Sequence, residues 1–198
     1  MNLTDTLAGT PDGAGGANRV YGVVSGLVTD NHDPEGRARV KLKFPWLAKD
    51  TESDWAKVVS FMAGKNRGAV FLPEVGDEVL VAFEHGDIHH PYVLGGLWNS
   101  EDSAPETNTS GKNNIRKIKS RSGHEIILDD SQGAEKIEIH DKTGKNIVII
   151  DSVKGEISLE SQMKLKLKSQ VIEIESGMQM KITAGAVMEI KGALVKIN

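Results

Sequence analysis

The chain has 198 residues, no cysteine and a formal net charge of -4. These values exclude a disulfide framework and a cysteine-ligated metal site, and they weigh against nucleic acid as a partner. No apolar run approaches the roughly 20 residues that a membrane-spanning helix requires. Residues 1–18 also lack the basic and apolar regions of a signal peptide, so we expect synthesis in the cytoplasm without a secretory signal.

Residue usage divides the chain near residue 100. All aromatic residues lie before residue 99 and all prolines before residue 106. Residues 1–100 carry 9 basic and 13 acidic residues, whereas the remainder carries 15 of each. We therefore predict a flexible N-terminal arm, a first domain, a polar linker and a second domain, at residues 1–18, 19–99, 100–113 and 114–198. For residues 1–18, a remnant of an expression vector is the alternative.

Short apolar segments punctuated by glycine and proline fill the first domain, which is typical of a small closed β-barrel. We expect strands at Arg19–Thr29, Arg37–Phe44, Trp55–Phe61, Gly68–Leu72, Glu78–His85 and Tyr92–Trp98. The expected barrel core consists of Val23, Val40, Leu42, Val58, Phe71, Val79, Val81 and Val93.

Apolar pairs separated by one residue recur through the second domain, from residue 137 to residue 197. The steps between successive pairs are 10, 10, 8, 7, 8, 8 and 7 residues, which indicates short strands with one apolar face. Nothing else in this half could cover that face, so we predict that three chains wind about one axis. The expected trimer core is Ile137, Ile139, Ile147, Ile149, Ile157, Leu159, Leu165, Leu167, Ile172, Ile174, Met180, Ile182, Met188 and Ile190.

Folds formed by one chain alone fit this series of apolar pairs less well. A single-chain β-helix needs longer coils, and a left-handed hexapeptide helix needs a strict six-residue step. A two-sheet sandwich stays open as an alternative, although its hairpins would call for regular turn sequences and wider core residues. In the trimer, the lysines of Lys164–Lys168 and the glutamates Glu173 and Glu175 would pair outside the core and fix the register, rather than bind a membrane surface.

The densest group of possible metal ligands is His85, His89 and His90, with Glu84 and Asp87. His89 and His90 are adjacent, so in a strand they would point to opposite faces and would not chelate one ion together. We interpret the group as a polar turn. No nucleophile elbow, phosphate loop or zinc-protease motif is present, so we predict no catalytic residue, no metal, no cofactor and no enzymatic activity.

A basic stripe alternates along one expected strand and consists of Arg37, Arg39, Lys41 and Lys43. Nucleic-acid-binding barrels combine such a stripe with exposed stacking aromatics. Here the domain is net negative and its aromatics lie near turns, so contact with a protein partner or with solvent is the preferred interpretation.

Residues 68–99, GAVFLPEVGDEVLVAFEHGDIHHPYVLGGLWN, resemble the OB-fold domain of contractile-injection spike proteins. These are the VgrG proteins of type VI secretion and the baseplate assembly protein V of contractile-tailed phages. Arg39–Leu47 and Ser122–Asp130 resemble the same family, the latter at the start of its spike. The positions that carry the family motif in the OB-fold are Pro73, Gly76, Asp77, Pro91, Gly95 and Trp98.

The resemblance implies an all-β homotrimer, in which three OB-folds form a collar and three C-terminal segments form a trimeric β-helix needle. It implies a structural central spike that punctures the target membrane mechanically and is assembled into a virion tail or an extracellular particle. VgrG proteins carry a large hub domain before the OB-fold, so a separate hub protein is expected at this end of the chain.

The last histidine is His140, so an iron-binding His-X-His apex is not expected. Val195, Ile197 and Asn198 would instead dock a PAAR-like tip protein. The alternatives that stay open are an OB-fold nucleic-acid-binding protein, the C-terminal part of a type VI secretion VgrG spike, and a carbohydrate-binding or adhesive β-structure.

Overall fold

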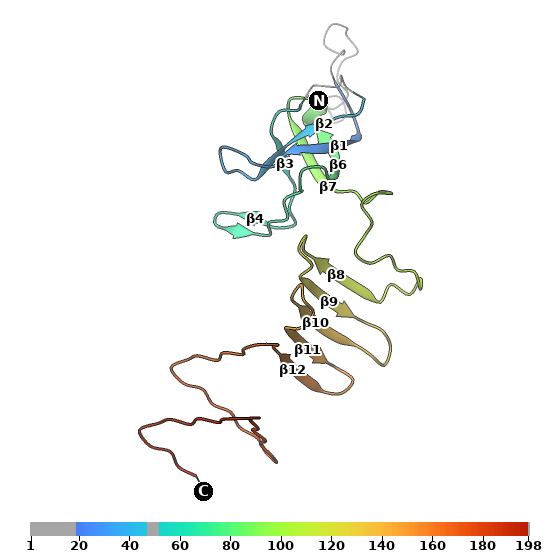
Figure 1. Cartoon of the computed structure of the whole chain (residues 1–198). Coiled ribbons are helices and arrows are strands. Elements are labelled where there is room, and N and C mark those ends of the chain that lie inside the picture. Colours follow the sequence, from blue (N-terminus) through green and yellow to red (C-terminus); the bar gives the residue numbers. More distant parts are fainter. Residues whose placement is uncertain (1–18, 47–51, 198) are drawn as a thin grey trace, which may run out of the picture. The chain divides into compact units, whose positions relative to one another are not determined.

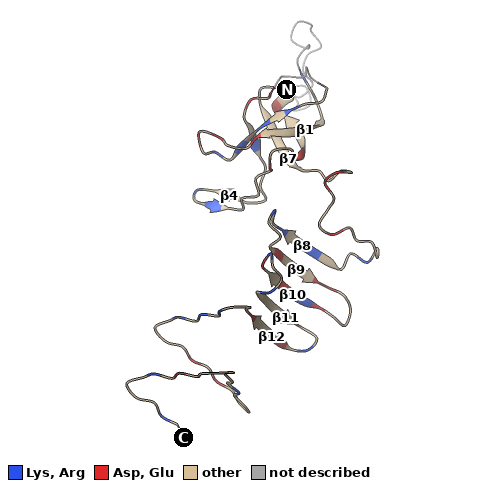
Figure 2. Ribbon diagram, in the orientation of Figure 1, with Lys and Arg blue, Asp and Glu red and all other residues tan. Residues whose placement is uncertain are grey.

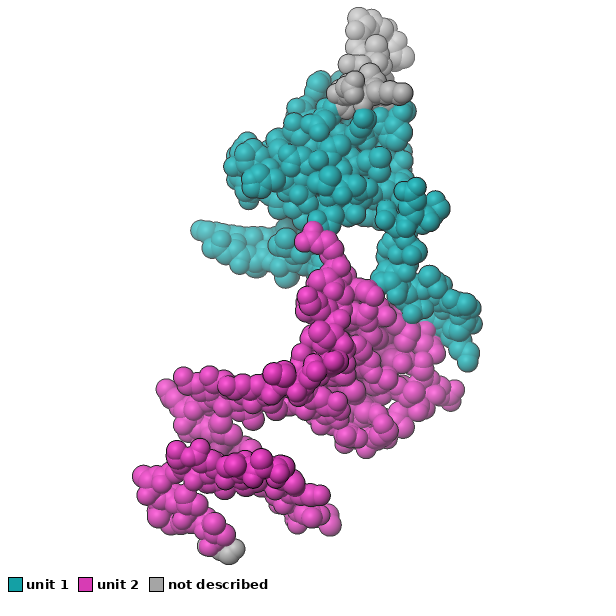
Figure 3. All heavy atoms as spheres, in the orientation of Figure 1, with its two compact units in different colours: residues 1–113 teal, residues 114–198 magenta. Residues whose placement is uncertain are grey.

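The structure is a computed structural model that describes residues 19–46 and 52–197. The chain divides into two compact units, residues 1–113 and residues 114–198, which are described separately below (Figure 1, Figure 3). The expected arm at 1–18 lies outside the described residues, as do Leu47 and Asn198. The described residues are all-β apart from one 3-10 turn, η2 (Glu84–Gly86), which confirms the predicted fold class at this level.

The first unit is built on a closed barrel with the strand order β1-β2-β3-β7-β6. Its strands are β1 (Val23–Asp30), β2 (Arg39–Lys43), β3 (Ala56–Val58), β6 (Glu78–Phe83) and β7 (Pro91–Gly96). All neighbouring strands are antiparallel except β3 and β7, which are parallel. A five-stranded closed barrel of this kind fits the OB-fold that the sequence predicted.

Alternating residues of these strands fill the barrel. Val40, Leu42, Val79, Val81 and Val93 are fully buried, which confirms five of the eight predicted core positions, and Val58 packs against the core. Further buried residues, not predicted, are Val28, Phe44, Ala56 and Phe83.

Two predicted core residues lie at the surface instead. Val23 is 55% exposed and Phe71 is 64% exposed. In β1 the inward positions are the even-numbered ones that include Val28, so the odd-numbered Val23 points outward. Phe71 lies in the connection between β3 and β6, where only Gly68 of the expected range Gly68–Leu72 belongs to a strand.

That connection contains a small hairpin of two-residue strands, β4 (Ala63–Gly64) and β5 (Arg67–Gly68). Gly68 has a φ of 150°, and a Cβ at this position would lie 2.7 Å from the carbonyl oxygen of Met62. Only glycine therefore allows this close approach of the two backbones. We call residues 59–72 the apolar arm, because they include five exposed large apolar side chains: Val59, Phe61, Met62, Val70 and Phe71.

The loop between β1 and β2 is held by one buried carboxylate. Asp33 accepts hydrogen bonds from the backbone N–H of Glu35 and of Arg37, both at 3.0 Å, and from two guanidinium nitrogens of Arg39 at 2.8 Å. The hydrogen bonds from Arg39 hold the pKa of Asp33 well below its ordinary value. A charged side chain is thereby buried without an unsatisfied acceptor, and the loop is fixed next to the barrel.

The second unit begins with a five-stranded antiparallel meander in the order β12-β11-β10-β9-β8. Its strands are β8 (Ile115–Lys119), β9 (Glu125–Asp129), β10 (Lys136–His140), β11 (Ile147–Asp151) and β12 (Glu156–Glu160). Each of the four connecting turns contains one glycine with positive φ, at residues 123, 133, 144 and 155. These glycines recur every 10 or 11 residues, and the meander ends where that spacing ends.

The register of the meander separates an apolar face from a polar face. Residues that lie directly opposite each other on neighbouring strands share a face of the sheet. Two such rows cross the sheet, one containing Ile139 and one containing Ile137, and each has an aliphatic residue on every strand from β9 to β12. The apolar face consists of Ile118, Ile126, Leu128, Ile137, Ile139, Val148, Ile150, Ile157 and Leu159, with Arg116 at one corner.

Ile147 and Ile149 lie on the opposite face, where Ile147 pairs with His140 and Ile149 with Glu138. The prediction that these two residues share the apolar face with Ile137 and Ile139 is therefore wrong. The neighbouring Val148 and Ile150 take that place, because β11 pairs with β10 so that Val148 lies opposite Ile139 and Ile150 lies opposite Ile137.

The chain from residue 161 to residue 197 forms no strand among the described residues, and every residue in it is exposed. It consists of extended stretches separated by bends at residues 162–163, 170, 177–178, 185–186 and 193. The predicted apolar pairs fall between these bends, so the 7- and 8-residue steps of the sequence correspond to one extended stretch each.

Candidate interaction surfaces

The apolar face of the meander is uncovered in the single chain. Eight of its aliphatic residues expose between 40% and 71% of their surface, the largest value being that of Ile157. No second sheet packs on this face among the described residues, so the two-sheet sandwich is not formed within one chain. Soluble monomers rarely expose a contiguous apolar patch of this extent, which marks the face as an interaction surface.

The opposite face is covered by its own side chains. Basic and acidic residues recur along the strands of the meander (Figure 2). Glu125 forms ion pairs with Lys117 at 3.4 Å and with Lys119 at 3.0 Å, and a hydrogen bond from Lys119 lowers the pKa of Glu125. Glu138 contacts His140 at 3.0 Å. The stems of these side chains shield Ile127, which is only 9% exposed. This face is suited to solvent.

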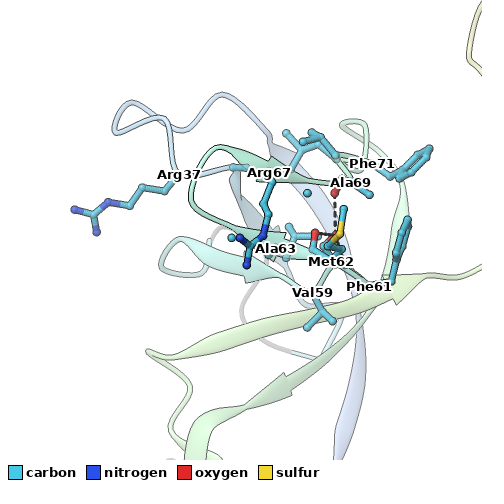
Figure 4. Close-up of a pocket in the computed structure, with 15 residues that line it drawn as sticks. Arg37, Val59, Phe61, Met62, Ala63, Arg67, Ala69 and Phe71 are labelled. Atoms are coloured by element: carbon cyan, nitrogen blue, oxygen red, sulfur yellow. Dashed lines mark hydrogen bonds between the residues drawn. The ribbon is translucent and has the colours of Figure 1, made fainter.

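A second uncovered apolar surface is the apolar arm of the first unit. The rings of Phe61 and Phe71 lie 6.5 Å apart and are 85% and 64% exposed. With Met62 and the two arginines Arg37 and Arg67 they line an open cavity of about 300 Å³ (Figure 4). The hydroxyl of Ser60 lies 3.0 Å from the carbonyl oxygen of Met62 and 2.8 Å from that of Ala69, which ties the two sides of the arm together.

The predicted motif residues form a turn that is attached to the end of β1. The N–H of Gly76 donates to the carbonyl of Val28 at 2.9 Å, and Val28 donates back to the carbonyl of Asp77 at 3.0 Å. The Asp77 carboxylate accepts the N–H of Glu74 at 2.8 Å, and the carbonyl of Pro73 accepts a hydrogen bond from Asn31. The turn between the apolar arm and β6 is therefore tied to the barrel.

The other motif residues lie on or after β7. Pro91 is buried at its start, opposite Phe83, and Gly95 pairs with Leu80 next to a register shift. Trp98 follows the strand and is 73% exposed.

Residues 24–98, which span the whole barrel, match the family described as the type VI secretion system/phage-baseplate injector OB domain. The chain carries an injector OB domain. This match and the spike proteins described next confirm the resemblance to contractile-injection spike proteins.

Several curated spike proteins match over more than half of the chain. The type VI secretion system spike proteins VgrG1c and VgrG5 of Pseudomonas aeruginosa are 32% identical over 122 residues and 35% identical over 127 residues. These matches cover 56% and 60% of this chain. The actin cross-linking toxin VgrG1 of Vibrio cholerae is 25% identical over 168 residues, or 81% of this chain. The chain spans only 17%, 16% and 15% of the length of these three relatives.

The predicted basic stripe lies on β2 and the loop before it, on the outer side of the injector OB domain. Most of its charge is paired: Arg37 contacts Glu35 at 2.7 Å, and Lys41 contacts Glu52 at 3.3 Å. Arg39 is bound to Asp33, and both Arg39 and Lys41 lie over the ring of Trp55 at 5.8 and 5.6 Å. Because these cations already have anionic or aromatic partners, the stripe has little free charge to offer a phosphate backbone.

The histidines are not gathered around one point. His89 contacts Asp54 at 2.9 Å, whereas His90 contacts Asp87 at 3.3 Å. His85 lies in η2 with a φ of 49°, and an open cavity of about 330 Å³ is lined by Arg19, Glu84, His85, Asp87 and His90 but not by His89. In the described part of the chain no group of three or more potential ligands is arranged to hold a metal ion. No helix of that part is long and apolar enough to cross a membrane.

The expected tip residues lie at the end of the extended segment. Val195 is 49% exposed and Ile197 is 89% exposed, while Asn198 lies outside the described residues. The apolar pairs at 165/167, 172/174, 180/182 and 188/190 are all exposed as well. Sequence reasoning identified these pairs but missed the apolar arm, whose signal is the run of aliphatic and aromatic residues on both sides of Gly64–Gly68.

Proposed function

We propose that this protein is the homotrimeric central spike of a contractile injection system or phage tail. Three injector OB domains form a collar, and three C-terminal units form a trimeric β-helix needle that punctures the target envelope. The single observation that carries the proposal is the uncovered apolar face of the meander, from Ile118 to Leu159, followed by a fully exposed segment with the same apolar periodicity.

The meander supports the proposal because its backbone is paired within one chain while its apolar face is not covered. Burying a full aliphatic side chain contributes roughly 1.5–3 kcal/mol. Every residue of the face therefore favours contact with another apolar surface. Three such faces around one axis would enclose a narrow core filled by isoleucine, leucine and valine, with the ion-paired faces toward solvent.

The segment 161–197 supports the proposal in a different way. Its residues have no strand partners among the described residues, and an extended chain with unpaired backbone groups is not stable alone in water. Winding three copies together would give each stretch strand partners in the neighbouring chains. The apolar pairs from Leu165 to Ile190 would then line the axis, one layer per step.

The stiffness of such a needle is the basis of its function. Interchain backbone hydrogen bonds along segment 161–197 and a dry core along the whole needle would make unfolding slow, because local opening of one chain would break contacts with two others. We expect resistance to heat and detergent. The needle would transmit an axial force from sheath contraction without enzymatic activity in this chain.

The two ends of the spike would contact other proteins. A hub protein would bind the collar formed by the OB domains, and a PAAR-like tip protein would bind the apolar end at Val195, Ile197 and Asn198. The assembled protein would be part of a virion tail or of an extracellular contractile particle. The division into an OB domain at 19–99, a linker at 100–113 and a spike at 114–198 belongs to the same proposal.

Solution mass tests this proposal directly. Light scattering of the full chain should give three times the 21.4 kDa of one chain. A stable folded monomer would overturn the proposal, because the apolar face and segment 161–197 would then have no partner chains. Binding to labelled single-stranded oligonucleotides serves as the comparison: tight, salt-sensitive binding would favour the nucleic-acid-binding alternative.

A further inference from the structure

The apolar arm exposes large apolar side chains that the described residues of its own unit do not cover. Its two strands are two residues each, and a hairpin of this size is marginal in water unless it packs on another surface. The side chains that would need covering include Phe61, Val70 and Phe71, with exposed fractions of 85%, 79% and 64%. We therefore expect a surface outside this barrel to pack against the arm.

The outer side of β1, β6 and β7 is the matching surface on the same unit. Ladder partners place Ser25 opposite Leu80 and Val23 opposite Ala82. The outward residues of the three strands include Tyr92, which lies opposite Ala82, and one charged residue, Glu78, which lies opposite Leu27. The uncharged outward residues between them are Val23, Ser25, Leu27, Leu80, Ala82 and Leu94. We call these six residues the acceptor face. The outer side of β2 and β3 differs, since it presents Arg39, Lys41 and Lys57.

The charges next to the apolar arm and next to the acceptor face are of opposite sign. The turn of the arm carries Lys65 and Arg67, and neither forms an ion pair with a described residue. The acceptor face ends at Glu78, which pairs with Leu27 across the ladder, and the preceding turn contributes Glu74 and Asp77. A basic tip and an acidic rim would thus meet when the arm lies along the acceptor face.

We infer that the apolar arm of one chain docks on the acceptor face of a second copy of this chain. Arm and acceptor face are different surfaces, so the contact is heterologous, and three such contacts close a ring. The inference rests on the proposed trimer and adds the contact that joins its OB domains. Among the described residues, Phe61, Val70 and Phe71 of the arm are exposed, and so are Val23, Leu27 and Leu94 of the acceptor face, whereas Ser25, Leu80 and Ala82 are half-buried. A head-to-tail ring requires such exposed area on both surfaces of every subunit.

Cysteine crosslinking tests the contact in the full chain, which has no native cysteine. Two differently tagged chains are co-expressed, one with Met62→Cys in the arm and one with Leu27→Cys in the acceptor face, and treated with a short bismaleimide. We expect a covalent pair that carries both tags. The double variant should give covalent trimers on a denaturing gel, whereas each single variant alone should stay uncrosslinked.

The matched control replaces Leu27→Cys by Lys57→Cys on the basic outer side, and it should give no crosslink to Met62→Cys. A trimeric mass without the dual-tag product would overturn this inference and leave the proposed spike intact. A crosslink to Lys57→Cys of equal yield, or one confined within single chains, would also overturn it. A monomeric mass would overturn both proposals.

Discussion

Ile157→Asp on β12 distinguishes a buried apolar face from an exposed one. In the single chain Ile157 is 71% exposed, so a monomer should tolerate the change with a cost within about 0.5 kcal/mol. In the trimer the exposed fraction would be buried, and its loss removes roughly 1–2 kcal/mol per chain, or roughly 3–6 kcal/mol for three chains.

The introduced carboxylates add a larger cost. Each would be taken out of water near two others, at an effective penalty of several kcal/mol per ion. The total is on the order of 10 kcal/mol or more per trimer, which corresponds to a weakening of association by about 10⁷-fold. We expect the variant to be monomeric or unfolded in its C-terminal unit, while the OB barrel keeps its own fold.

Light scattering and far-ultraviolet circular dichroism measure the outcome. The control is Ser158→Asp, one residue further along the same strand, where Ser158 pairs with Ile149 on the polar face. That variant should keep the trimeric mass. If Ile157→Asp also keeps it, or if both variants lose it equally, the inward assignment of the apolar face is refuted.

Two further predictions concern the OB barrel. Leu42→Ala removes a fully buried side chain and should lower the free energy of unfolding by about 2–5 kcal/mol, measured by urea denaturation, whereas Lys43→Ala on the same strand should have little effect. Asp33→Asn should lower the melting temperature at neutral pH and flatten its decline on acidification. The pKa of Asp33 is depressed in the folded state, so its contribution is present above the ordinary value of 3.8 and lost as the pH falls below it. An unchanged acid profile in the variant would contradict that role.

The inward residues of β2 could be predicted from the sequence because they alternate with basic ones, and those of β6 because they belong to a β-branched apolar segment. Val40 and Leu42 are separated by Lys41, and Val79 and Val81 lie in a segment that starts with a charged residue. Val23 could not be placed in this way, since the segment from Val20 to Val28 contains apolar residues of both parities. Shifting a strand by one residue moves every side chain to the opposite face of the sheet. A short run of consecutive apolar residues therefore does not determine which of them point inward.

The same ambiguity explains the misplaced pair on β11. Ile147, Val148, Ile149 and Ile150 are four consecutive aliphatic residues, and either alternating pair fits an apolar face. The ladder to β10 decides between them: it places Val148 opposite Ile139 and Ile150 opposite Ile137. Long-range pairing of this kind is not encoded in local periodicity, and the pairing of these five strands within one chain was not predicted from the sequence.

The spacing between apolar pairs changes within the C-terminal unit, and this change explains where strands form within one chain. Up to residue 160, steps of 10 or 11 residues leave room for a five-residue strand and a glycine turn, so each strand pairs with the next in the same chain. After residue 160 the steps shorten to 7 or 8, and no described glycine in this stretch adopts positive φ. A step of 7 or 8 residues is too short to hold both a five-residue strand and the turn that would connect it to the next strand, so consecutive stretches do not form a hairpin. In the proposed trimer the chain would therefore pass from pairing with itself to presenting extended stretches for other chains. The apolar periodicity of the sequence continues across this boundary, so the self-paired meander would hold three chains in register while the segment after it winds together.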